Sequence, residues 1–266
     1  MTEPSWVSGH HTAMFDIKPR LRAAGIHLGV SACIALVAAA LVFGLWFRWP
    51  YREVSGGTDL FLIVIAVDVC LGPLITLSVF DRAKGWPVLR RDLAFVALLQ
   101  LGGLAYGLWT VHLARPVHLV FEVDRFRVVH AADIPTDLAA KVPRGIDSPP
   151  WTGPTLLAVR PFRNPGESVQ ATMVALGGIH LAARPDLWEP YVAARGAVLQ
   201  VARPVSDLRR RFPSEAGAID EAIREAGRPE SQLAYLPLVG RKAAAWTVLI
   251  DGRSAEVQGY LRLDSF

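Results

Sequence analysis

Three long apolar runs in the first half of the chain constrain the fold more than any other feature. They cover residues 25–47, 60–80 and 93–113, and each approaches the roughly 20 residues with which an α-helix crosses a ~30 Å hydrocarbon core. The chain has 266 residues, of which 52% are hydrophobic, and such a composition is unusual for a soluble protein of this length. These runs predict three transmembrane helices, followed by a globular domain.

The first run could be confused with a secretory signal, because residues 38–40 are alanines that offer a cleavage site. The apolar stretch continues past them through LVFGLWF, which makes it longer than the apolar region of such a signal. We therefore expect an uncleaved membrane helix.

Positive charges flank the runs unevenly. Cations precede the first run and separate the second from the third: Lys18, Arg20, Arg22, Arg82, Lys84, Arg90 and Arg91. Because short cytoplasmic loops carry the excess of Lys and Arg, the N-terminus is predicted to lie in the cytoplasm. The chain is then predicted to divide into a cytoplasmic segment (residues 1–24), a three-helix transmembrane domain (25–113) and an extracytoplasmic domain (114–266), here named the outer domain.

The extracytoplasmic domain is predicted to be α+β with a mostly antiparallel sheet. Alternating apolar residues predict a half-buried strand at 117–123, and further strands are expected at 126–129, at TLLAVRPF, and in the tail at LAYLPLV, AAWTVLID and EVQGYLRLD. Asp124 and Arg125 are expected to turn the chain so that residues 126–129 return as the second strand of a hairpin, and Asp251 and Gly252 form a turn dipeptide between the last two strands.

Two or three helices accompany this sheet. One is expected within residues 164–178, with Gly177 as its C′ residue, and a short one at residues 136–141. Another is expected at residues 215–226, with Ser214 as N-cap and Gly227 ending it. The basic residues 209–211 are interpreted as a solvated helix face.

Charge and cysteine content argue against several classes of function. Lys and Arg number 28 against 24 Asp and Glu, and this near balance does not indicate nucleic acid binding. Cys33 and Cys70 both fall inside predicted membrane helices, so no disulfide is expected in the outer domain. Without clustered Cys and His ligands, neither a metal site nor a cofactor is predicted.

Asp68 stands in the middle of the second run, LIVIAVDVCLGPLIT. It lies about 15 Å below the outer end of that helix, near the midplane, where a carboxylate is expected to face protein rather than lipid. Gln100 of the third helix lies within about 5 Å of the same level by the helical rise, whereas His27 lies more than about 10 Å away. Gln100 is therefore the expected neighbour of Asp68.

Small and polar residues form seams on the predicted helices. Asp68, Gly72 and Thr76 share one stripe, and Pro73 weakens the helix there. Gly103 and Gly107 form a second seam that allows close approach of another helix, and a third runs through Gly25, Gly29 and Cys33. Two hypotheses follow: the seams hold the three helices together, or one of them binds a transmembrane helix of another protein.

The sequence contains no G-x-S-x-G, P-loop or H-E-x-x-H motif. Glu122 and Asp124 are interpreted as solvated strand residues, and no Ser or Cys stands at a recognisable spacing from His118, His130 or His180. We expect a protein that is not an enzyme. An extracytoplasmic sensor or scaffold, and a small membrane enzyme using Asp68, remain as alternatives.

Several long stretches carry a resemblance to a known family. KPRLRAAGIHLGVS, YREVSGGTDLFLIVIAVDVCLGPLITLSVFD, LRRDLAFVALLQLGGLAYGLWTVHLARPVHLVFEVDRFRVV and the closing AYLPLVGR and WTVLID are similar to the type IV pilin accessory proteins. The likeness is strongest over residues 17–133 and does not include residues 1–13.

This resemblance implies a chaperone-like helper of pilus assembly in the bacterial inner membrane, with residues 114–266 in the periplasm. Its implied partner is the type IV pilin subunit, together with other pilus assembly components, and the family carries no established catalytic residues. Pilins of this type hold an apolar N-terminal helix in the membrane. The resemblance therefore implies an occupant for the seam around Asp68.

Overall fold

The computed structural model describes residues 17–81, 84–241 and 245–266. Most of the predicted cytoplasmic segment, and Arg82 among the cations used to orient the chain, lie outside these residues. The chain divides into two compact units. The first comprises residues 1–36 and 65–105, and the second comprises residues 37–64 and 106–266.

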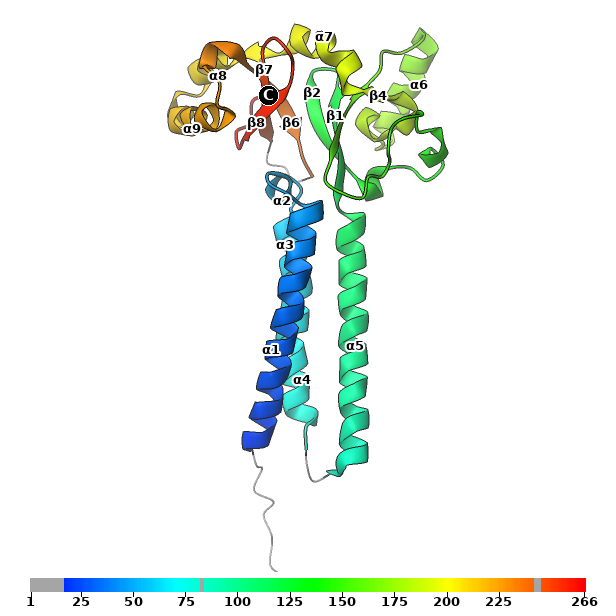
Figure 1. The fold of residues 1–266 in the computed structure, drawn as a ribbon. Helices are drawn as coiled ribbons and strands as arrows, with labels where there is room; N and C mark the ends of the chain where they lie inside the picture. The colour runs from blue at the N-terminus through cyan, green and yellow to red at the C-terminus, as the bar shows by residue number, and fades with distance from the viewer. Residues whose placement is uncertain (1–16, 82–83, 242–244) are drawn as a thin grey trace, which may run out of the picture. The chain divides into compact units, whose positions relative to one another are not determined.

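All three apolar runs are helical, and each helix begins earlier than the sequence predicts (Figure 1). The first consists of α1 (Ile17–Leu41) and a π-helical turn η1 (Val42–Trp46). The second consists of α3 (Gly57–Ala66), a π-helical turn η2 (Val67–Leu71) and α4 (Gly72–Val79), and the third is α5 (Trp86–Leu113). Each is long and apolar enough to cross a membrane.

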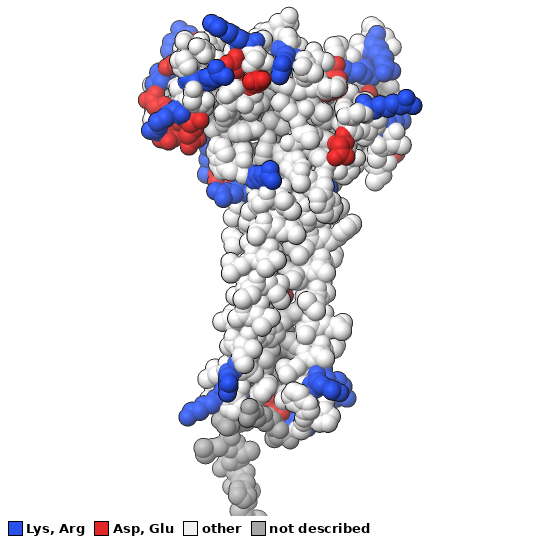
Figure 2. Space-filling model, in the orientation of Figure 1, with Lys and Arg blue, Asp and Glu red and all other residues white. Residues whose placement is uncertain are grey.

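One face of α5 is buried and the opposite face is open. Leu89, Val96, Leu104, Gly107 and Val111 are buried, at the helical spacing of a single face. Large apolar side chains cover the other face: Phe95, Leu98, Leu99, Leu101 and Tyr106. Figure 2 shows the helices as a largely uncharged surface, with Lys and Arg side chains near the end closest to the N-terminus. This surface suits an apolar surrounding.

A mixed eight-stranded sheet forms the centre of the second unit. Its order is β4-β3-β1-β2-β6-β7-β8, with β5 paired to β6. The strands are β1 (Pro116–Glu122), β2 (Arg125–His130), β3 (Thr155–Val159), β4 (Trp188–Pro190), β5 (Arg203–Pro204), β6 (Leu233–Val239), β7 (Trp246–Asp251) and β8 (Val257–Leu261). The predicted hairpins β1–β2 and β7–β8 are confirmed, but β1–β3 and β2–β6 are parallel pairs that the prediction of a mostly antiparallel sheet missed. Long connections separate the partners in both parallel pairs.

Strand β1 is buried over its whole length, so the prediction of a half-buried strand is wrong. Leu119 and Phe121 pack into one apolar cluster, and Val117 and Val120 into another on the opposite side. Its polar residues therefore lie inside the domain.

Four α-helices accompany the sheet in the described part of residues 114–266: α6 (Pro165–Leu176), α7 (Tyr191–Val201), α8 (Val205–Arg211) and α9 (Ala216–Ala226). In Figure 1, α8 and α9 lie beside β8, and α6 lies beyond β4. The sequence predicted α6 and α9 but not α7, because YVAARGAVLQV contains Gly196 and three valines, which have a low helix propensity. Only a 3₁₀ turn (Ala139–Lys141) occupies the place of the predicted short helix.

Three predicted helix boundaries can be compared with the structure, and two need correction. Glu215, not Ser214, is the N-cap of α9, because Ser214 belongs to a 3₁₀ turn (Pro213–Glu215) that precedes it. Gly178, with φ of 98°, takes the left-handed conformation after α6, whereas Gly177 remains at −75°. Gly227 ends α9 in the left-handed conformation, as predicted.

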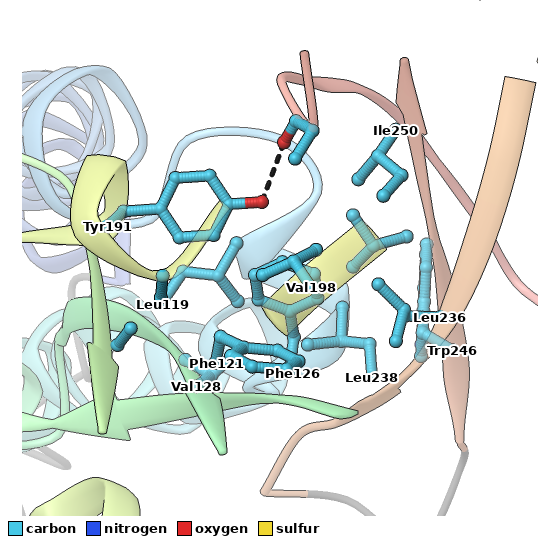
Figure 3. Close-up of a cluster of buried hydrophobic side chains, with 14 of the residues drawn as sticks. Leu119, Phe121, Phe126, Val128, Tyr191, Val198, Leu236, Leu238, Trp246 and Ile250 are labelled. Carbon is cyan, nitrogen blue, oxygen red and sulfur yellow. Dashed lines mark hydrogen bonds between the residues drawn. The ribbon is translucent and has the colours of Figure 1, made fainter. Parts of the chain in front are cut away.

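Helix α7 closes the main core of the second unit (Figure 3). Its Tyr191 and Val198 pack against apolar side chains of four strands, Leu119, Phe121, Phe126, Val128, Leu236, Leu238, Trp246 and Ile250. The Tyr191 hydroxyl donates a 2.6 Å hydrogen bond to the carbonyl oxygen of Ala255. The short helix α2 (Tyr51–Val54), from the loop between the first two long helices, contributes two further core residues.

Candidate functional site

Asp68 lies in η2, the π-helical turn of the second long helix. The Nε2 group of Gln100 donates a 2.9 Å hydrogen bond to the main-chain carbonyl of Asp68. Gln100 is the neighbour that the helical rise predicts. The bond is to the carbonyl oxygen, however, and not to the carboxylate.

Proline explains why this carbonyl accepts a side-chain donor. In a π-helical turn each carbonyl pairs with the N–H five residues ahead, and five residues after Asp68 stands Pro73, which has no N–H. Gly72 allows Gln100 to approach, because a Cβ atom at Gly72 would overlap the Gln100 amide. Pro73 thus leaves the Asp68 carbonyl without a main-chain donor, and Gly72 leaves room for the Gln100 amide to reach it.

The carboxylate of Asp68 is half-buried. Within the described residues it makes no hydrogen bond or ion pair of its own. His27, which the sequence placed too far away to pair with it, instead contacts Thr76 with 2.5 Å between Nδ1 and Oγ1. Asp68 is therefore a polar group at mid-helix whose side chain has no bonded partner in the described chain.

The remaining predicted residues separate into packed and open positions. Gly72 and Thr76 are buried, facing Gln100 and His27 respectively. Gly107 is buried against Val64 in the second unit. Three other glycines are exposed, and a Cβ atom added to any of them would meet no atom within 4 Å: Gly25, Gly29 and Gly103.

In the outer domain, His118 is fully buried between two hydroxyl groups. Its Nδ1 lies 2.7 Å from Oγ1 of Thr155, and its Nε2 lies 3.0 Å from Oγ of Ser148. Burial lowers the pKa of His118 to about 4, so the imidazole is uncharged at neutral pH and a weak base. The Ser–His contact, which spacing along the sequence did not indicate, joins a loop to β1 and β3.

Glu122 is buried, so its interpretation as a solvated strand residue is wrong. One carboxylate oxygen accepts a 2.5 Å hydrogen bond from Nε of Arg127, and the other accepts a 2.9 Å bond from the main-chain N–H of Ala182. Asp124 is exposed, as expected, and pairs with its neighbour Arg125. The two acids thus have different environments, although they stand two residues apart.

Three helices long and apolar enough to cross a membrane, followed by a mixed α/β domain, indicate a membrane protein, and comparison with known proteins identifies the family. Residues 15–56 match the family described as Fimbrial assembly protein FimB. The chain is 29% identical to the Fimbrial assembly protein of serogroup I from Dichelobacter nodosus, over 91% of this chain and 94% of that relative, and equally to that of serogroup E1. It is 35% identical over 113 residues to the protein of serogroups C1 and C2, covering 42% of this chain and 86% of that relative.

The chain therefore belongs to the fimbrial assembly protein family, and the resemblance that the sequence predicts is confirmed. No solved structure matches it. Family membership supports a role in fimbrial assembly.

Proposed function

We propose that this protein is a non-catalytic, chaperone-like accessory protein of the bacterial inner membrane that assists or modulates type IV pilin subunits during assembly. Its N-terminus lies in the cytoplasm and its α/β domain in the periplasm. The names of its relatives, fimbrial assembly proteins, support the general role. The distribution of cations around the helices supports the orientation.

One observation carries the proposal: the half-buried carboxyl group of Asp68 in the middle of an apolar helix. An ionisable side chain at this depth costs roughly 2.5–3.5 kcal/mol on insertion scales, and such residues usually mark a functional site. Gln100 already donates the hydrogen bond that the main-chain carbonyl of Asp68 requires. The carboxyl group itself is left for another purpose, and pairing with a visiting helix provides one.

Exposed neighbours of Asp68 offer a surface for such a helix. Val67 and Leu71 flank it on η2 and are exposed. In a membrane, a passing pilin helix would pack on this apolar surface and satisfy the Asp68 carboxyl group with a polar group of its own. The pilin would thereby be held by its membrane helix before it enters the fibre.

A non-catalytic role agrees with the chemistry of the polar groups described above. His118 is a weak base because its pKa is low, and Glu122 is engaged in an ion pair and a main-chain hydrogen bond. Both groups connect parts of the domain, which is a structural use.

Photo-cross-linking in membranes tests the proposal. A cross-linking amino acid at Val67 or Leu71 should capture the pilin subunit, and a probe at Leu98, an exposed residue of α5, serves as the matched control. The Asp68→Leu substitution should weaken the Leu71 adduct several-fold without changing the amount of protein in the membrane.

The pattern of adducts separates the outcomes. Pilin adducts only from probes on the outer domain, such as Val192, would reject docking in the membrane but keep the helper role. Absence of pilin from every adduct and from the co-purified material would reject the helper role and favour a sensor or scaffold.

A further inference from the structure

A cavity of about 560 Å³ lies where the second long helix begins. Its lining comes from the end of the first long helix, from α2, from the start of α3 and from the open end of the β7–β8 hairpin. All of these residues belong to the second unit of the chain. Charged and apolar side chains therefore meet in one cavity at the level where an apolar helix starts.

Two short segments bring charged side chains to this cavity. In α2 the first and last residues are buried in the core, so that Arg52 and Glu53 between them are exposed. Trp246 begins β7 and Arg262 directly follows β8, so these two residues are neighbours across the antiparallel hairpin. The packing of both segments thus determines where the charges lie.

The charges of the lining balance. The side chains of Arg52, Glu53 and Arg262 make no hydrogen bond or ion pair with any residue that the structure describes. Asp59, in the first turn of α3, adds a second carboxylate. The cavity therefore carries two positive and two negative charges.

Other donors without a partner line the same cavity. Trp246 is only 4% exposed, and its indole N–H donates to no residue in the described ranges. The main-chain N–H of Thr58 also has no acceptor there, because it belongs to the first turn of α3. N–H groups at the start of a helix favour an anion such as phosphate. Together with the two guanidinium groups, these donors suit a phosphate group.

The surroundings become apolar along the helices. Phe43 lines the cavity and packs against Phe61, with 5.1 Å between the ring centroids, which joins the first two long helices. Leu62 follows Thr58 by one helical turn, and Leu62 and Ile63 are exposed on α3. A ligand that fits this place is therefore amphiphilic, with a charged part in the cavity and an apolar part on the helices.

The balance of charges selects the headgroup of such a ligand. A simple anion would be attracted by the two arginines but repelled by Glu53 and Asp59. A headgroup that carries both a phosphate and an ammonium group can interact with both pairs of side chains. A primary ammonium group has three N–H donors for the carboxylates, whereas a quaternary ammonium group has none.

We infer that this cavity binds the headgroup of a phosphatidylethanolamine-type phospholipid. Arg52 and Arg262 bind its phosphate, Glu53 and Asp59 bind its ammonium group, and its acyl chains lie along the apolar surface of α3. The inference rests on the proposed placement of the three helices in a membrane. It adds a specific lipid ligand, which the proposed contact with pilin does not require.

The test uses the full chain, purified in detergent and freed of lipid, and phospholipids with identical acyl chains but different headgroups. The headgroups are ethanolamine, choline and glycerol, and native mass spectrometry measures the binding of each lipid. The ethanolamine lipid should bind about five-fold or more tightly than the others, because choline has no N–H donor and glycerol has no cation for Glu53.

Two substitutions separate the two charges of the headgroup. Glu53→Gln should weaken binding of the ethanolamine lipid by about five-fold and affect the choline lipid less, because the charged acceptor for the ammonium N–H groups is lost. Arg262→Gln should weaken both lipids, since both carry the phosphate. Arg253→Gln, in the turn at the opposite end of the β7–β8 hairpin, is the matched control and should change neither. All three side chains are exposed, so these substitutions leave the core intact.

Equal binding of the three lipids, no binding of any, or a preference for the glycerol lipid overturns the inference. Glycerophosphoethanolamine, which has the headgroup without acyl chains, should compete poorly with the lipid. If it competes as well as the lipid does, the ligand is a soluble phosphate compound and the inference is also overturned.

Cross-links from Val67 and Leu71 test the proposed function separately. Pilin adducts at these positions, in a protein that shows no preference among the lipids, would support the proposed function and reject the lipid site. A preference for the ethanolamine lipid without pilin adducts would support the lipid site and reject the membrane contact with pilin.

Discussion

The side-chain amide of Gln100 binds the main-chain carbonyl of Asp68, 32 positions away along the chain, at a distance of 2.9 Å. This contact links α5 to the π-helical turn at the point where Pro73 removes a main-chain donor. In an apolar surrounding, an open carbonyl is costly because water cannot reach it. Gln100 therefore has a structural task that is separate from the Asp68 carboxyl group.

Replacing Gln100 by Leu should destabilise the first unit by about 1–3 kcal/mol, because the Asp68 carbonyl would lose its donor. Thermal unfolding of the full chain in detergent measures the effect. Leu98→Ala, at an exposed position of the same helix, is the control and should change stability much less. Equal stability of Gln100→Leu and the parent protein would show that the carbonyl finds another donor.

Gly72→Ala should destabilise the same contact, because the added Cβ overlaps the Gln100 amide. Moving the amide aside breaks its hydrogen bond to the Asp68 carbonyl, which costs about 1–3 kcal/mol. Gly103→Ala is the matched control: it is also a helical glycine, but its Cβ would meet no atom within 4 Å. Thermal unfolding should therefore separate the two variants, with Gly103→Ala unchanged or more stable. The opposite order would contradict the packing described for Gly72.

Glu122→Ala should lower the free energy of unfolding by about 3–5 kcal/mol, because it leaves Arg127 without its buried partner and frees the Ala182 N–H. Asp124→Ala removes an exposed carboxylate of the same hairpin, and surface pairs contribute only about 0–1 kcal/mol. Thermal unfolding of both variants provides the comparison. Similar losses would mean that the buried pair contributes no more than the surface one.

The stability of the outer domain should fall on mild acidification because of His118. Burial lowers its pKa to about 4 from an ordinary value of 6.5, so between these values the unfolded chain binds a proton that the folded chain does not. The contribution is complete above pH 6.5 and is lost as the pH falls towards 4. At about 1.4 kcal/mol per pKa unit it amounts to about 3 kcal/mol.

Melting temperature measured between about pH 7 and pH 4 checks this prediction. His118→Gln has no ionisable group at this position, so its melting temperature should depend less steeply on pH even if the protein is less stable overall. An identical slope in both proteins would assign the acid sensitivity to other groups.

The sequence predicted the level of contact between Asp68 and Gln100 because the helical rise converts residue number into depth. It could not predict that the carbonyl is the acceptor. That depends on the π-helical turn, which no propensity pattern indicates. The three long helices were predictable because an apolar run of about 20 residues is typical of a membrane-spanning helix.

The outer domain was predictable where contacts are local. The hairpins β1–β2 and β7–β8 join strands that are neighbours in sequence, and both were predicted. The parallel pair β2–β6 joins segments about a hundred residues apart, with four helices between them, and alternation within a strand says nothing about such a partner.

The small helix α2 has a consequence for how the protein can be divided. Tyr51 and Val54 belong to the core of the outer domain, and the Tyr51 hydroxyl lies 2.7 Å from that of Tyr260. Gly240 is required opposite Val54, because a Cβ there would overlap it. A fragment that begins at Ala114 would thus lack part of its own interior. The loop that contains α2 is therefore an integral part of the domain. A separately produced domain needs this loop as well, either fused to its N-terminus or added as a peptide.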